Sequence, residues 1–114
     1  MANTYKVIPK LISVDTIADV YEVPAATTSI IRSISVYNTD GSAMNVTLSV
    51  YDTSATTRYT YDYKAALAAT TKFEFLNSSN SILLVLEEAD KLQVTCSTTG
   101  GLNLIVSTLE ISRA

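Results

Sequence analysis

The chain has 114 residues, one cysteine, no histidine and a formal net charge of −3. This length suits one domain with one modest hydrophobic core. The lack of histidine excludes hydrolases that pair Ser or Cys with His, and it leaves zinc without its usual ligands. No run of Lys or Arg forms the basic surface that phosphate binding requires. We therefore expect no enzyme activity, no cofactor, no metal site and no nucleic-acid partner.

Only 17% of the residues are charged, against a typical value of about 25%. Ser, Thr, Asn and Ala take their place, and such an uncharged exterior suits strands and surfaces that other protein covers. Cys96 is expected to be a small buried hydrophobe. A lone cysteine excludes an internal disulfide and fits synthesis in a reducing cytoplasm. The longest apolar run is too short to cross a bilayer, so no membrane partner is expected.

Residues 1–14 are predicted to form an N-terminal arm beside a sandwich domain of residues 15–114. The large apolar side chains of this arm are Tyr5, Val7, Ile8, Leu11 and Ile12. They follow no sustained period, and Pro9 removes one backbone donor. The arm is therefore at most an edge strand, and otherwise an extended tail over a neighbouring subunit. In either case its five apolar side chains are candidate interface residues.

The stretch 30–52 is predicted to be a β-hairpin around the dipeptide Asp40-Gly41. Its second arm, residues 44–51, alternates apolar and polar side chains, as is typical of a strand with one covered face. In the first arm, strict alternation would bury the charge of Arg32. A β-bulge that shifts the register avoids this burial, and pairing of Arg32 in an interface is the alternative.

Alternation gives the segment 58–64 a face of three tyrosines, Tyr59, Tyr61 and Tyr63. Burial of this row inside the sandwich is one interpretation. Three buried hydroxyls would each need a partner, so we favour the boundary of the core or an oligomer interface. A row of aromatic rings also suits stacking on sugars, although the chain has no Trp. The segment 64–69 is predicted to be a single helical turn or a loop.

The apolar run from Ile82 to Leu86 predicts a strand that is buried on both faces. An acidic turn follows this run. Glu88 and Asp90 have the chemistry for a calcium site, but no D-x-D-x-D spacing supports one. The stronger interpretation is that Asp90 caps its own turn.

The dipeptide Gly100-Gly101 predicts a hairpin turn before the closing strand 102–111. The apolar parity of this strand switches along its length, which predicts a bulge near Ser107 or Thr108. About eight strands at regular spacing, with no convincing helix, indicate an all-β chain. The predicted fold is a single-domain antiparallel β-sandwich, jelly-roll-like, with an extended N-terminal arm.

Three segments resemble a family of small β-sandwich structural proteins in the virions of tailed bacteriophages. They are YEVPAATTSIIRSISVYNTDGSAMNVTLSVYD at 21–52, LEEADKLQVTCST at 86–98 and GLNLIVSTLEI at 101–111. The shared pattern is a Val-Pro-Ala turn before an apolar strand, then an Asn-x-x-Gly hairpin, and later an acidic turn of Ala-Asp or Gly-Asp type that opens the penultimate strand. Ala89 stands where such turns often carry Gly. The opening arm and the tyrosine strand lie outside the resemblance.

This resemblance implies a non-enzymatic virion protein that forms homo-oligomers and binds other virion proteins such as the major capsid protein. Its expected location is the virion, after synthesis in the cytoplasm of a bacterial host. Capsid decoration or cementing is the first hypothesis, and a neck, tail or fibre-attachment component is the alternative. A carbohydrate-binding module with the tyrosine row as its platform is the third hypothesis.

Overall fold

The computed structural model describes residues 2–12, 17–76, 84–97 and 101–112. All regular secondary structure in these ranges is β-strand, as predicted. The strands are β1 (Ala2–Ile12), β2 (Ala18–Glu22), β3 (Thr27–Asn38), β4 (Met44–Asp52), β5 (Thr57–Leu67), β6 (Lys72–Leu76), β7 (Leu84–Leu86), β8 (Lys91–Cys96) and β9 (Leu102–Ser112).

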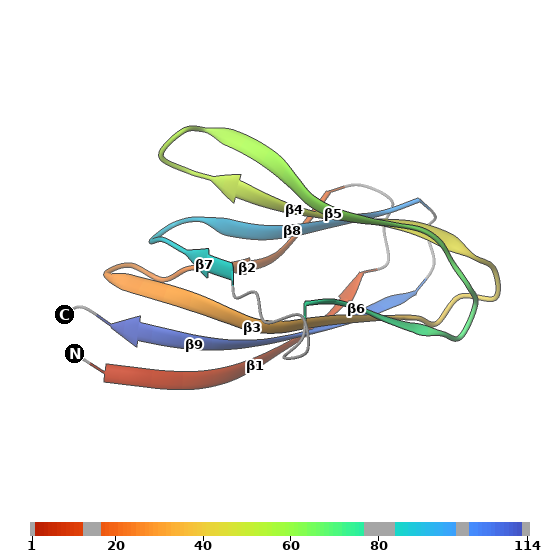
Figure 1. Ribbon diagram of the computed structural model, residues 1–114, viewed down its shortest axis with the longest axis horizontal. Helices are drawn as coiled ribbons and strands as arrows, with labels where there is room; N and C mark the ends of the chain where they lie inside the picture. Colours follow the sequence, from red (N-terminus) through yellow and green to blue (C-terminus); the bar gives the residue numbers. More distant parts are fainter. Residues whose placement is uncertain (1, 13–16, 77–83, 98–100, 113–114) are drawn as a thin grey trace.

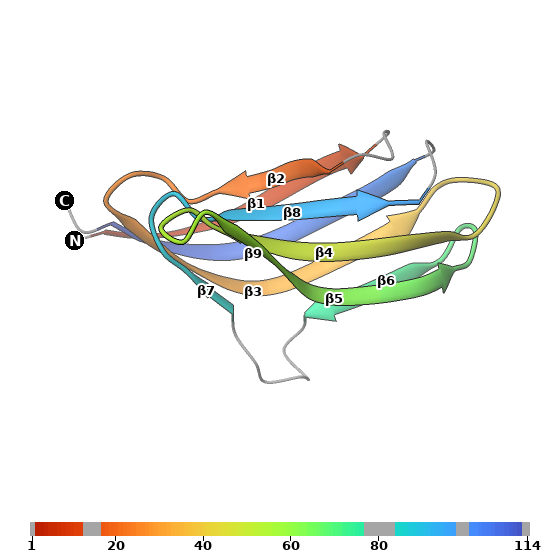
Figure 2. The ribbon, with the colours of Figure 1, turned by 90° about the horizontal axis from the view of Figure 1, so that it is seen from above.

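The strands form two antiparallel sheets that pack face to face (Figures 1 and 2). Sheet A has the order β1-β9-β3-β6, with β7 also paired with β3, and sheet B has the order β2-β8-β4-β5. The pairs are nested, because β4 pairs with β5, β3 with β6 and β7, β2 with β8, and β1 with β9. The chain thus doubles back at the β4–β5 turn and wraps into two layers. This topology is a jelly roll, so the predicted fold class is confirmed.

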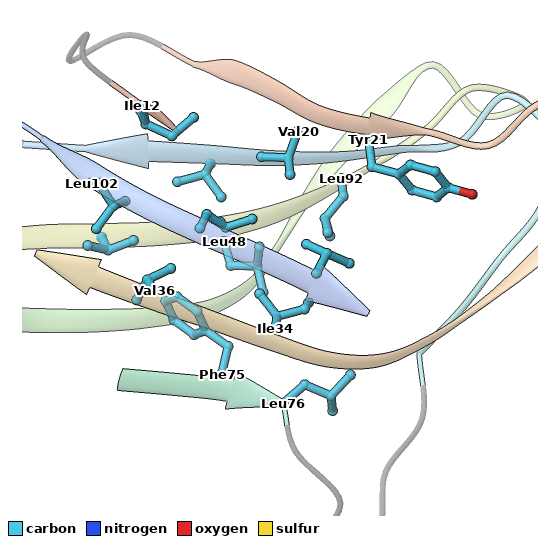
Figure 3. Close-up of a cluster of buried hydrophobic side chains, with 14 of the residues drawn as sticks. Ile12, Val20, Tyr21, Ile34, Val36, Leu48, Phe75, Leu76, Leu92 and Leu102 are labelled. Atoms are coloured by element: carbon cyan, nitrogen blue, oxygen red, sulfur yellow. The ribbon is translucent and has the colours of Figure 1, made fainter. Parts of the chain in front are cut away.

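Alternation along the strands sends every second side chain between the sheets, where one hydrophobic core forms (Figure 3). Ile34 and Val36 of sheet A and Leu48 and Leu92 of sheet B are each at most 1% exposed. Each side chain of this kind stabilises the fold by about 1.5–3 kcal/mol when fully buried. Cys96 lies in the same core, which confirms its predicted burial.

The predicted hairpin at residues 30–52 is wrong in its pairing. β3 pairs with β9 in sheet A, whereas β4 pairs with β5 and β8 in sheet B. The loop 39–43 therefore crosses from one sheet to the other. Gly41 has no positive φ there, so the turn does not use the conformation that makes Asp-Gly favourable in hairpins. Each strand has one apolar face, and the two faces cover each other when the strands lie in opposite sheets.

The buried side chain of Asn38 holds together the two loops that follow β3 and β5. Its Nδ2 donates to the carbonyl oxygens of Ser42 at 3.0 Å and Leu67 at 2.9 Å. Its Oδ1 accepts a hydrogen bond from the backbone N–H of Asp40 at 2.8 Å. Asn38 itself is 0% exposed. One amide therefore satisfies backbone groups of both crossing loops.

The bulge predicted in β3 is confirmed. The register shifts between Ile31 and Ser33, and Arg32 is exposed on the outer side. The bulge predicted in β9 is wrong, because β9 pairs with β1 without a shift over its whole length. Inward and outward side chains therefore alternate along the whole of β9, and Thr108 and Glu110 point inward. The hairpin predicted before β9 is also wrong, since β8 and β9 lie in different sheets.

The polar side chains of Thr108 and Glu110 point inward, and hydrogen bonds satisfy their polar groups. The hydroxyl of Thr108 donates to a backbone carbonyl of β3 at 3.1 Å. Glu110 accepts a hydrogen bond from the hydroxyl of Tyr21 and pairs with Lys6 at 3.1 Å. Burial and the hydrogen bond to Glu110 raise the pKa of Tyr21, so its hydroxyl stays protonated and donates. This network connects β2 of sheet B to β1 and β9 of sheet A.

Two further segments differ from the sequence prediction. Val85 is 57% exposed because it points to the outer side of sheet A, opposite Ile30, so the run 82–86, of which residues 84–86 are described, is not buried on both faces. β5 continues to Leu67, so the helical turn or loop predicted at 64–69 is wrong over most of its length. Pairing with β4 stabilises this segment as a strand, whereas a helix this short is unstable on its own.

Asp90 caps the turn between β7 and β8, which confirms the capping interpretation. Its Oδ2 accepts a hydrogen bond from the backbone N–H of Glu87 at 3.1 Å, and its Oδ1 accepts one from the backbone N–H of Thr53 at 3.2 Å. Glu88 instead accepts a hydrogen bond from the backbone N–H of Ala26 at 2.8 Å. The two carboxylates thus serve separate backbone groups, and their geometry does not support a shared calcium ion.

Ala89 in this turn has a φ of 70°, a left-handed conformation that costs a residue with a Cβ about 1–2 kcal/mol. Ala89→Gly should raise the free energy of unfolding by about 1 kcal/mol or slightly less, because Gly also has the higher entropy in the unfolded chain. Urea unfolding followed by circular dichroism measures the change. Ala25→Gly in the adjacent turn is the control, since Ala25 has no positive φ and should gain nothing. A less stable Ala89→Gly would contradict this turn geometry.

Candidate interaction surface

The outer face of sheet A carries a group of exposed apolar side chains. On β1, Tyr5, Val7 and Leu11 are 70%, 66% and 63% exposed. Pro9 lies between them, opposite Ile105 on β9. We call this group the apolar face; its members are Tyr5, Val7, Pro9, Leu11, Tyr37 and Ile105. Domains that work alone rarely leave large contiguous apolar patches in water, so the apolar face indicates an interaction site.

The predicted N-terminal arm is the edge strand of sheet A. β1 pairs with β9 along its whole length, from Ala2 opposite Ser112 to Ile12 opposite Leu102. Ile12 is 1% exposed, and Ile8 packs against the same core. These two candidate interface residues therefore belong to the core of their own domain.

β1 also has an open edge. Its side away from β9 pairs with no strand among the described residues. An open edge offers unpaired N–H and C=O groups to another chain, and proteins often protect such edges with Lys and Pro. Lys6, Pro9 and Lys10 give β1 part of this protection, but its outward row stays apolar. The open edge and the apolar face meet along β1 and form one continuous surface.

A hollow of about 510 Å³ opens beside β1 on sheet A. The small side chains of Ser33 and Ser107, which are paired across β3 and β9, leave this space. The residues that line the hollow are Tyr5, Lys6, Val7, Arg32, Ser33, Glu74, Ser107 and Thr108. The guanidinium carbon of Arg32 lies 5.9 Å from the ring centroid of Tyr5, within the range of a cation–π contact. The bulge thus places a cation at the rim of the apolar face.

The predicted row of three tyrosines is split. β5 shifts register against β4 between Tyr59 and Tyr63. Tyr63 lies opposite Thr47, whereas Tyr59 lies opposite Val50, whose side chain packs against the core. Tyr59 and Tyr61 line a second hollow of about 270 Å³, and Tyr63 lines a different one. The three rings therefore do not form one stacking platform, which removes the observation that favoured a carbohydrate-binding module.

The sequence patterns missed part of the apolar face. Ile105 alternates with the buried Leu104 and Val106, and this alternation was the available indication that Ile105 points outward. Leu109 and Ile111 also point outward and are half-buried on the outer side of sheet A. The bulge that was wrongly predicted in β9 placed them on the inner side instead. No local pattern indicates that Arg32 reaches Tyr5, because the two residues lie on strands that are distant in the sequence.

Two kinds of functional feature are not found in the described ranges. No group of three or more Cys, Asp or Glu side chains lies together in a way that suits a metal ion in the part of the chain that the structure describes. Within the same ranges, no helix has the length and hydropathy needed to span a bilayer. The surface of sheet A, with its apolar face and hollow, is the candidate site.

The chain is similar in structure to a chain of the Bacillus endospore appendages, described as a novel family of disulfide-linked pili. The TM-score is 0.56 and the identity 12%, over 99% of this chain and 88% of that chain. A chain from infectious bursal disease virus, Gx strain, matches with a TM-score of 0.47 and 13% identity, over 97% of this chain and 32% of the viral chain. No protein-family model matches the sequence, and no curated protein matches it. At this identity the first similarity shows a shared fold.

Proposed function

We propose that this chain is a non-enzymatic structural subunit that works inside a protein assembly. The observation that carries the proposal is the apolar face together with the open edge of β1. Burying Tyr5, Val7 and Leu11 against a neighbour removes large apolar surface from water, which is the main favourable term in protein association. A subunit therefore gains from these side chains, and a domain that works alone does not.

We further propose that the assembly is the virion of a tailed bacteriophage. In this role the chain decorates or cements the capsid by binding the major capsid protein and further copies of itself. The sequence resemblance at 21–52, 86–98 and 101–111 supports this role. These segments include β3, β4, β8 and β9, the inner strands of both sheets. A place in the neck, tail or fibre attachment is the alternative, since the apolar face serves either location.

A filament is the second kind of assembly to consider, because the fold is shared with a chain of the disulfide-linked Bacillus pili. The only cysteine of this chain, Cys96, is 1% exposed in the core. The folded domain therefore has no surface thiol for a covalent link between subunits. A filament of this chain would depend on noncovalent contacts, which again requires the apolar face.

Peptide mass spectrometry of purified phage particles tests the virion proposal. The chain should be present in the particles, with hundreds of copies for a capsid or tube component and a dozen or fewer for a neck or baseplate component. Electron microscopy of the purified protein distinguishes filaments from discrete oligomers. Absence from the particles would overturn the virion proposal.

Val7→Lys tests the apolar face directly. The substitution places a charge in the centre of the exposed row on β1, so it should weaken self-association about tenfold or more while the isolated domain stays folded. Sedimentation velocity over a concentration series measures the change, and a circular dichroism melt checks the fold. Thr60→Lys on the exposed edge strand β5 of sheet B is the control and should leave association unchanged. Equal behaviour of both variants would remove the apolar face from the proposal.

A further inference from the structure

Building on the proposed function, we propose that copies of this chain contact each other head to tail, with unlike surfaces. The apolar face and its hollow on one copy receive the acidic end of the next copy. The acidic end consists of the turn between β2 and β3 and the turn between β7 and β8, with the exposed carboxylates of Glu22, Glu87 and Glu88. Figures 1 and 2 show these two turns next to each other, at the end of the sandwich where β9 finishes.

The two surfaces carry charges of opposite sign. On the outer side of sheet A, Arg32 and Lys72 accompany the acidic Glu74. Lys6, which pairs with Glu110, and Lys10 alternate with the apolar side chains of β1 and therefore point to the other side of the sheet. Acidic residues dominate the rest of the described chain, where they are Asp19, Glu22, Asp40, Asp52, Asp62, Glu87, Glu88 and Asp90 against Arg58, Lys64 and Lys91. The apolar face thus has the cation of Arg32 at its rim, and the acidic end carries exposed carboxylates. Surfaces of opposite sign attract and orient two copies before they touch.

Arg32 is the cation best placed to meet an acidic partner. It is exposed at the rim of the hollow, and it has no carboxylate at ion-pair distance among the described residues. Lys6 is different, because its ammonium already pairs with Glu110. The ring of Tyr5 holds the guanidinium of Arg32 beside the apolar face. A planar guanidinium in this position suits a bidentate bond to one carboxylate of the next copy.

The acidic end combines charge with apolar surface, and hydrogen bonds hold its two turns together. Two backbone hydrogen bonds of 3.0 Å join its turns, one from Val23 to Asp90 and one from Ala89 to Val23. Pro24 and Ala25 are exposed beside the carboxylates. A preformed surface of this kind loses little conformational entropy when it binds another copy. Its apolar side chains and acidic groups match the apolar side chains and the cation of the opposite surface.

A symmetric contact between two apolar faces is less favourable. It would bring the guanidinium of Arg32 in one copy toward that of the other, and like charges across an interface weaken binding. A head-to-tail contact avoids this repulsion, and it leaves one unused surface at each end of a pair. Repeated contacts of this kind produce a closed ring or an open filament. The proposed contact therefore fits an assembly with many copies.

Two charge reversals test the contact. Arg32→Glu and Glu87→Lys should each fold normally and weaken self-association about tenfold or more, because each places like charges across the contact. The side chain of Glu87 is exposed and forms no ion pair with another described residue, so its reversal disturbs only the surface. Arg58→Glu, on exposed β5, is the matched control and should associate like the unmodified protein. The unmodified protein should also associate more weakly as salt rises.

A mixture of the two variants distinguishes a contact between unlike surfaces from a contact between like surfaces. In a mixture, the carboxylate introduced at position 32 of one variant meets the ammonium introduced at position 87 of the other. The next contact along the assembly joins the unchanged Arg32 of the second variant to the unchanged Glu87 of the first. Head-to-tail association should therefore recover in the one-to-one mixture and not in either variant alone.

Sedimentation velocity measures the recovery of association, and circular dichroism melts confirm that each variant is folded. If Arg32→Glu does not fold, Arg32→Gln replaces it, and its association should fall about threefold or more. Variants that associate like the unmodified protein, or a mixture without recovery, would overturn the head-to-tail contact while the structural role stands. A protein that stays monomeric at every concentration also overturns it, and mass spectrometry of phage particles then decides separately on the proposed function.

Discussion

Replacing Leu48 with Asp should abolish folding. Leu48 is 0% exposed in the middle of β4, and its paired position on β5 is already the acidic Asp62. An unpaired carboxylate in this place costs several kcal/mol, which is comparable to the roughly 5–15 kcal/mol that stabilise a whole domain. Circular dichroism of Leu48→Asp should show no cooperative melting of β structure.

Thr47→Asp is the control for this prediction. Thr47 is next to Leu48 in the chain but points to the outer side of sheet B, where it is half-buried opposite Tyr63 and Thr95. A carboxylate there reaches water, so the variant should fold with a melting temperature close to that of the unmodified protein. A folded Leu48→Asp with an unchanged melting temperature would contradict the inward parity of β4.

The sequence predicts which side chains of β4 point into the core, because this depends on local chemistry. Alternation places one face of a strand in the core, and the cost of burying a charge requires the bulge at Arg32. The capped turn at Asp90 follows from the same kind of local argument, since the carboxylate bonds to a backbone group three residues earlier. Each of these features depends on residues that are neighbours in the chain.

The choice of neighbouring strand is not predictable in this way. The Asp40-Gly41 dipeptide favours a hairpin, yet β3 and β4 lie in opposite sheets and their apolar faces meet across the core. Alternation determines which face of a strand is buried but does not determine which strand lies beside it. The same uncertainty concerns β1, whose irregular pattern resembles an arm although the strand pairs with β9 over its full length.

The candidate site was predicted in part for the same physical reason. Tyr5, Val7 and Leu11 are recognisable as interface candidates because they lie on one short segment without a core period. Arg32 and Ile105 join them only through the pairing of β1, β9 and β3, which the tertiary fold decides. The tyrosine row failed because a single register shift in β5 moves side chains to the other face of a sheet.

Asn38→Ala should lower the free energy of unfolding by about 3 kcal/mol or more. The substitution removes the hydrogen bonds to Ser42, Leu67 and Asp40 and leaves their backbone groups without this partner. Each buried polar group that loses its partner costs about 1–3 kcal/mol, and the loss falls on both loops that cross between the sheets. Urea unfolding at neutral pH, followed by circular dichroism, measures the change.

The matched control is Asn103→Ala. Asn103 lies on β9 opposite Tyr37, which directly precedes Asn38 in β3, but the side chain of Asn103 is exposed on the outer side of sheet A. Its removal should change the free energy of unfolding by less than about 0.5 kcal/mol, as is usual for surface substitutions. The difference between the two variants then isolates the buried hydrogen bonds from the general effect of replacing Asn in a strand. A cost below about 1 kcal/mol for Asn38→Ala would show that water replaces the amide, and that the crossing loops are held by their backbone contacts alone.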